Sequence, residues 1–150
     1  MLLILASSAA AIAVATPIHS AEITHASNAY RASYETESTV RFREVESRFA
    51  NRPSMPVCRW QAELVVNRDV ATQGRALAAV AKPIHRFAPL SGSHAGSCAA
   101  ARDEIEAEVA RHAGARAAEA VAVARQDRAA LLGELDGIHA LSAKGAVTGG

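Results

Sequence analysis

The chain has 150 residues, half of them apolar, and a formal net charge of +1. This length fits one domain, and the near balance of charge excludes a dedicated nucleic-acid surface, where a basic excess would be visible. Because only 4% of the residues are aromatic and alanine supplies much of the apolar content, we expect a modest core that benefits from a covalent cross-link.

The first segment, residues 1–21, carries no charged side chain, and Leu2 to Ala15 form an apolar run that is short for a membrane span. Small residues and Pro17 follow the run, as in the cleavage region of a signal peptide. No lysine or arginine precedes it, so either the α-amino group alone supplies the positive end or the true start lies upstream. A buried N-terminal helix is the alternative to a signal peptide. We expect a signal peptide over 1–21, cleaved at a position within 15–21, and no membrane span in the mature protein.

The next segment, residues 22–37, is polar and small apart from two tyrosines, and it fits either a linker or a first strand. Residues 38–47 alternate apolar and charged side chains and predict a strand. Residues 50–56 contain two prolines and an asparagine, which predicts a turn. Residues 58–66 alternate again, which predicts a second strand with Cys58 on its buried side.

The middle of the chain is less regular. Residues 67–74 predict a loop, and residues 75–81 fit either a short helix or an edge strand. Residues 84–90 predict a third strand, whose proline confines its end to a sheet edge. Residues 91–97, SGSHAGS, predict a loop of small residues before a long helix that begins at 98 or 99 and ends near 135.

Several signals support that long helix. Ser97 is the expected N-cap, and acidic residues lie near the positive end of the helix dipole. One stripe is apolar and contains Ile105, Val109, Ala113, Ala120, Ala124, Leu131, Leu135 and Ile138. The sequence leaves open whether Gly114 splits the helix. Residues 139–150 offer few side chains that could pack in a core, which predicts a disordered tail.

The two cysteines, Cys58 and Cys98, are expected to form a disulfide. Export leads to an oxidising compartment, where two cysteines pair by default. Cys98 falls on the apolar stripe of the predicted helix, so both thiols face one core. A bridge that closes about 40 residues stabilises a fold by roughly 4 kcal/mol in the chain-entropy model. A zinc site needs about four ligands at short spacing, so we predict no metal and no cofactor. A catalytic thiol that uses His94 is the weaker alternative.

The most distinctive local feature is the loop before the helix, because backbone amides at a helix start can hold an anion. His85 and His94 could meet at a strand end, with Arg86 nearby, and these three residues are the candidate binding residues. The alternative is a flexible turn that positions Cys98 for its bridge. No catalytic residues are predicted.

We therefore predict an α+β fold in which an antiparallel sheet of three to four strands packs on a long C-terminal helix, with one disulfide. The expected divisions are a signal peptide over 1–21, a linker or first strand over 22–37, a single domain over 38–138 and a disordered tail over 139–150. We expect a non-enzymatic binding or structural role in the periplasm or outside the cell, with an envelope or extracellular protein as partner. The alternative is a small periplasmic enzyme or ligand-binding protein that uses residues 85–98.

Overall fold

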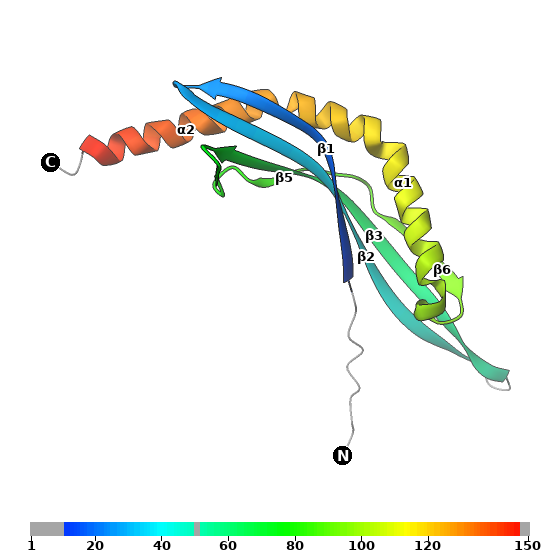
Figure 1. Cartoon of the computed structure of the whole chain (residues 1–150). Coiled ribbons are helices and arrows are strands. Elements are labelled where there is room, and N and C mark those ends of the chain that lie inside the picture. The colour runs from blue at the N-terminus through cyan, green and yellow to red at the C-terminus, as the bar shows by residue number, and fades with distance from the viewer. Residues whose placement is uncertain (1–10, 50–51, 148–150) are drawn as a thin grey trace, which may run out of the picture. The chain divides into compact units, whose positions relative to one another are not determined.

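A computed structural model describes residues 11–49 and 52–147 (Figure 1). Its elements are β1 (Ala11–His25), β2 (Asn28–Phe49), β3 (Arg52–Thr72), β4 (Arg75–Ala76), β5 (Lys82–Arg86), β6 (Leu90–Ala95), α1 (Cys98–Gln126) and α2 (Arg128–Val147). The α+β class and the antiparallel sheet are confirmed. The expected strand number is wrong, because the described residues form six strands in the order β1-β2-β3-β4, with β5 and β6 also paired to β3.

The N-terminal segments form β1 and the first part of β2. Residues 11–21 of the expected signal peptide form most of β1, and residues 1–10 lie outside the described part of the chain. The segment 22–37, which fitted a linker or a strand, lies in β1 and β2 around a two-residue turn. The strand expected at 38–47 is confirmed as part of β2. The expected turn at 50–56 falls partly outside the described residues, and β3 already begins at Arg52.

The expected loop at 91–97 is wrong over its first five residues, because they belong to β6. Trp60 on β3 lies opposite Gly92 on β6. A Cβ atom at Gly92 would come within 2.8 Å of the Trp60 indole. A strand beside this large ring therefore requires a residue without a side chain. The glycine and serine residues of this segment are typical of a loop, but here their small size lets the strand lie next to Trp60.

The expected loop at 67–74 is also wrong over most of its length. β3 continues to Thr72, and Gln73 and Gly74 make a two-residue turn with positive φ angles of 49° and 75°. β4 returns from this turn, and residues 77–80 then form a further turn. The ambiguous segment 75–81 is thus a very short edge strand and a turn.

The first hairpin, between β1 and β2, turns at Ala26 and Ser27. Their φ angles are +46° and +65°, in the left-handed region that L-residues disfavour. Two successive left-handed residues match the right-handed twist of a two-residue hairpin. Neither residue is the asparagine or glycine that this turn prefers.

The described chain comprises two compact units, and the single domain predicted over 38–138 stays a prediction. Unit 1 contains residues 11–14, 37–49, 52–64 and 87–115. In unit 1, α1 lies along β3 and β6 (Figure 1). Its core comprises Val40, Phe42, Cys58, Trp60, Ala62, Ala101, Ile105 and Val109. Arg102 places its guanidinium carbon 5.3 Å from the centre of the Phe42 ring.

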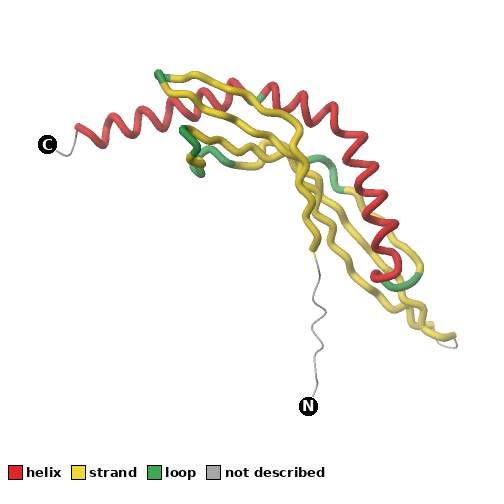
Figure 2. Tube along the Cα trace, viewed as in Figure 1, coloured by secondary structure: helices red, strands yellow, loops and turns green. Residues whose placement is uncertain are grey.

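Unit 2 contains residues 15–36, 65–86 and the part of the helical region from Arg116 onward. In unit 2, helix packs against one face of the strands, as the red and yellow tubes of Figure 2 show. Its core comprises Ile23, Tyr30, Ala32, Tyr34, Val70, Val80, Ala124, Leu131 and Leu135. Both tyrosines of the predicted linker or first strand are therefore core residues.

The helical region confirms the expected cap and stripe but not the expected end. The backbone N–H of Ala100 donates to the Ser97 hydroxyl oxygen at 3.3 Å. The stripe positions from Ile105 to Leu135 are buried, apart from the partly exposed Ala113. The break comes at Asp127, between α1 and α2, and Gly114 lies within α1. α2 continues to Val147, where the sequence predicted a disordered tail from residue 139.

Candidate functional site

The predicted disulfide is confirmed in unit 1. The sulfurs of Cys58 and Cys98 are 2.11 Å apart, and the Cα atoms are 4.7 Å apart. Cys58 is completely buried beneath the start of α1. The backbone N–H of Cys98 also donates to the Glu44 carboxylate at 3.0 Å. The bond therefore ties β3 to the first turn of α1 inside the core of the unit.

The three candidate binding residues pair with separate stretches of β3. His94 lies on β6 opposite Cys58, and its Nδ1 is 3.7 Å from Oε2 of Glu104. His85 and Arg86 lie on β5 opposite Val66 and Val65. His94 belongs to unit 1, whereas His85 and Arg86 belong to unit 2. Ligand binding by these residues stays a prediction.

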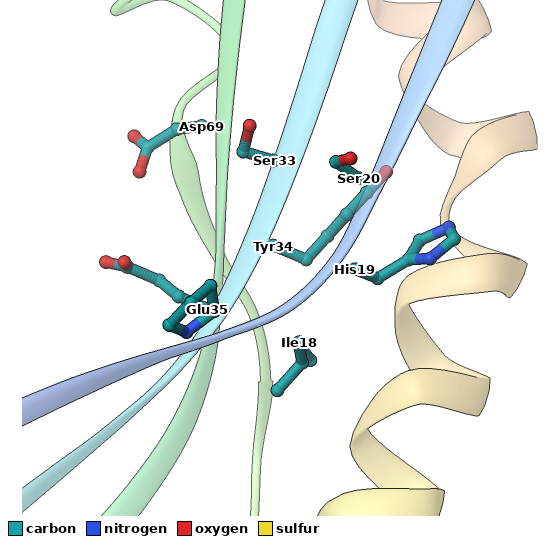
Figure 3. Close-up of a pocket in the computed structure, with 8 residues that line it drawn as sticks. Ile18, His19, Ser20, Ser33, Tyr34, Glu35 and Asp69 are labelled. Atoms are coloured by element: carbon teal, nitrogen blue, oxygen red, sulfur yellow. The ribbon is translucent and has the colours of Figure 1, made fainter.

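A hollow of about 350 Å³ opens on unit 2 (Figure 3). Its lining consists of Pro17, Ile18, His19 and Ser20 from β1, Ser33, Tyr34 and Glu35 from β2, and Asp69 from β3. Ser33 and Glu35 lie on the face of β2 opposite to buried Tyr34, because side chains alternate along a strand. The hollow therefore combines hydroxyl groups and two carboxylates on the sheet face that the helix does not cover.

Tyr34 lines this hollow and also contacts the helical layer. The rings of His19 and Tyr34 stack with their centroids 5.8 Å apart. The Tyr34 hydroxyl donates a hydrogen bond to Oδ2 of Asp127 at 3.1 Å. Burial, together with the charge and hydrogen bond of Asp127, raises the pKa of Tyr34 to about 12. The phenol therefore stays protonated over the physiological range and acts as a fixed donor.

Asp127 is part of a buried ionic network centred on Arg68, whose side chain is 0% exposed. Nη1 of Arg68 donates to Asp127 at 2.8 Å, and Nη2 donates to Glu134 at 2.5 Å. Nε and Nη2 also donate to the backbone oxygen of Val80, at 3.0 and 2.8 Å. Nζ of Lys82 lies 2.7 Å from the second oxygen of Glu134. The network joins β3, β5, the turn before β5, the break residue Asp127 and α2.

The charges in this network reinforce one another. Burial alone would lower the pKa of Arg68, but the hydrogen bonds and charges of Asp127 and Glu134 outweigh it and raise that pKa. Burial alone would raise the pKa of Glu134, but Lys82 and Arg68 outweigh it and lower that pKa. Arg68 and Glu134 thus stay charged near neutral pH. This arrangement is suited to holding the α1–α2 break in place rather than to exchanging protons.

A second polar cluster joins the end of β1 to α2. The rings of His25 and His139 stack with centroids 5.3 Å apart, and the Tyr30 hydroxyl shares a hydrogen bond of 3.1 Å with His139 Nε2. His25 Nε2 lies 3.0 Å from Asp136, at ion-pair distance but without hydrogen-bond geometry. Within residues 11–49 and 52–147, no three or more metal-ligating side chains gather as a metal site. This cluster packs α2 against the first hairpin.

Sequence reasoning missed the Arg68 network, although two signals were present. Arg68 and Val70 continue the parity that places Cys58 and Trp60 on the buried face. Asp127 and Glu134 lie three and ten residues after Ala124, close to the apolar stripe of the helix. The alternation at Arg68 and Val70 was missed because the composition of residues 67–74 is typical of a turn. The positions of Asp127 and Glu134 were missed because acidic residues in a helix are ordinarily solvated.

Comparison with protein-family models, with curated proteins and with solved structures gave no match to this chain. No helix among the described residues combines the length and the apolarity that crossing a membrane requires.

Proposed function

We propose that this protein is exported and serves as a non-enzymatic binding module in the bacterial envelope or outside the cell. The observation that carries the proposal is the Cys58–Cys98 bond, which is built into the core of unit 1. Disulfides form and persist in oxidising compartments and are rare in the cytosol.

The burial pattern of β1 is compatible with loss of a leader. Among residues 11–21, none is fully buried, and only Ile12, Ile18, His19 and Ala21 are partly buried. The first buried residue of β1 is Ile23, beyond every expected cleavage position. Removal of the leader therefore takes away no fully buried side chain among these residues.

The Arg68 network of unit 2 is suited to holding the structure together rather than to general acid–base catalysis. Arg68, Glu134 and Tyr34 all have pKa values shifted away from neutrality. General acid–base catalysis needs a group whose pKa lies near the working pH. Ser33, Glu35 and Asp69, which stay in the chain after the leader is removed, instead offer hydrogen-bond partners and negative charge to a ligand or partner.

Expression of the full chain with a C-terminal tag in a bacterium, followed by fractionation, tests the proposal. We expect the protein in the periplasm or medium, with a new N-terminus between residues 16 and 22 by mass spectrometry. A matched control carries Ala9→Arg and Ala10→Arg, which place charges inside the apolar run. The control should keep its N-terminus and stay in the cytosol. An intact N-terminus and a cytosolic location for the parent chain would contradict the proposal.

A further inference from the structure

β1 is an edge strand of the sheet, and its register on β2 follows from the two-residue turn at Ala26 and Ser27. This turn places Glu22 opposite Arg31 and His19 opposite Tyr34. Two contacts agree with the register. Nη2 of Arg31 lies 3.0 Å from Oε1 of Glu22, and the rings of His19 and Tyr34 stack.

The same register identifies the backbone groups of β2 that face β1. In an antiparallel pair the backbone groups of successive residues point to alternate neighbours, and the residues that flank a two-residue turn bond to each other. The N–H and C=O groups of Ala32 and Tyr34 therefore face β1. Consistently, the oxygen of Ala29, which has the other parity, accepts a hydrogen bond from Thr72 on β3 at 2.9 Å. Ala32 and Tyr34 are buried, with exposures of 0% and 2%.

Residues 15–21 of β1 pair with β2 at this edge but bury little side-chain surface. None of their side chains is fully buried, and Pro17 has no N–H to donate to a ladder. Ile18 packs at the margin of the unit 2 core. Such a segment can leave without removing the core, but its loss exposes the backbone groups of two buried residues. An unpaired strand edge of this kind is a template for pairing with another chain.

We propose that removal of the leader up to Ala21 opens the β2 edge at Ala32 and Tyr34, and that this edge binds an extended segment of a partner protein as an added strand. The inference rests on the proposed export. The segment that the structure seats on this edge, with His19 against Tyr34, defines the geometry of the occupant. Added strands gain affinity from main-chain hydrogen bonds and specificity from alternate side chains.

The chemistry of the edge narrows the class of partner. On the helix side, the occupant places an aromatic or apolar side chain against the Tyr34 ring, as His19 does here. On the uncovered side, Ser20 lies with Ser33, Glu35 and Asp69 around the hollow. Figure 3 shows Glu35 and Asp69 on one side of the strands and His19 directed toward the helix. A basic residue at the position of Ser20 would complement the two carboxylates. The partner segment is therefore an extended strand with one apolar face and a basic group on the other.

The test uses the chain that begins at Glu22, with its disulfide intact, and a labelled peptide with the sequence of residues 11–21. Fluorescence anisotropy should show saturable binding, and hydrogen exchange at the Ala32 and Tyr34 amides should slow at least tenfold when the peptide binds. A peptide with His19→Pro lacks the N–H opposite Tyr34 and should bind at least tenfold more weakly. A peptide with Ser20→Lys should bind several-fold more tightly at low salt, and 1 M NaCl should abolish that gain.

Three outcomes would overturn the inference. A chain from Glu22 that does not fold, by circular dichroism and tryptophan fluorescence, would make residues 11–21 a permanent part of the sheet. A folded chain that does not bind the peptide, or that binds the His19→Pro peptide as tightly as the parent peptide, would exclude the β2 edge as a binding site. Pairing of the Glu22 chain with itself through β2, seen by sedimentation, would replace the partner with a second copy. The fractionation experiment tests leader removal separately. An intact N-terminus refutes export, whereas a new N-terminus before Glu22 supports export but leaves part of β1 on the edge and overturns this inference alone.

Discussion

The replacement Arg68→Met should strongly destabilise unit 2. The variant loses two hydrogen bonds to carboxylates, from Nη1 to Asp127 at 2.8 Å and from Nη2 to Glu134 at 2.5 Å, and two to the backbone oxygen of Val80. Each such bond contributes about 1.5–3 kcal/mol. The variant also leaves Asp127, whose side chain is 9% exposed, without its cationic partner. Methionine recovers part of the loss by filling the space with apolar atoms. We therefore expect the free energy of unfolding to fall by about 3–5 kcal/mol, as for other broken buried pairs.

Urea unfolding at pH 7 provides the assay, because the two units carry different chromophores. Both tyrosines of the chain, Tyr30 and Tyr34, lie in unit 2, and the single tryptophan, Trp60, lies in unit 1. Tyrosine absorbance should report the loss at Arg68. The matched control is Arg31→Met, which breaks an arginine–glutamate pair whose arginine side chain is 68% exposed. An exposed pair of this kind contributes less than about 1 kcal/mol.

A combined variant separates the charge from the packing. Tyr34→Phe, Arg68→Met and Asp127→Leu together remove the hydroxyl, the cation and one carboxylate. Because an apolar replacement of a buried ion pair is often close to neutral, this variant should regain most of the stability lost in Arg68→Met. The reasoning is refuted if Arg68→Met costs no more than Arg31→Met, or if the combined variant is no more stable than Arg68→Met alone.

Three further predictions concern single positions. Gly92→Ala should lower the stability of unit 1 by about 1–3 kcal/mol, because the added Cβ would lie 2.8 Å from the indole. Urea unfolding followed by Trp60 fluorescence measures the loss. In the control, Gly114→Ala, the added Cβ meets open space within α1, and the variant should gain up to about 1 kcal/mol of stability. Ser27→Gly should raise the midpoint of thermal unfolding, with a gain of about 1 kcal/mol, because glycine adopts the φ of +65° without steric cost; an unchanged midpoint contradicts the strained turn. The pKa of Tyr34 is raised to about 12, above the ordinary value of about 10, so its contribution to stability is complete below pH 10 and lost as pH rises toward 12. Tyr34→Phe should flatten this alkaline decline, and an equal decline in both proteins would contradict the buried hydrogen bond.

The parts of the fold that the sequence predicted are those with a simple period. Cys58 and Trp60 alternate with polar residues, so the buried face of β3 follows from its parity. The helix stripe from Ile105 onward follows from a period of 3.6 residues in the same way. Once both cysteines are placed on buried faces, only the assumption of an oxidising compartment is needed to predict their bond.

The parts that failed depend on contacts between distant residues. β6 contains glycine and serine, and it is a strand because Gly92 fits against Trp60, thirty-two residues earlier in the chain. Arg68 lies on the same alternating positions as the buried residues of β3. A buried arginine, however, is stable only with partners such as Asp127 and Glu134, and no local sequence pattern predicts those partners. The break likewise comes at Asp127, a member of that network, and not at Gly114, the residue with the lowest helix propensity in α1.

The redox state of Cys58 and Cys98 in protein taken from its native location tests the export and the cross-linked core of unit 1 most directly. Cells are lysed in the presence of an alkylating reagent, and the purified chain is analysed by mass spectrometry before and after reduction. We predict that neither cysteine is alkylated until the protein is reduced, and that reduction then shifts the unfolding of unit 1, followed through Trp60, to lower urea. Alkylation of both thiols without reduction would contradict the account.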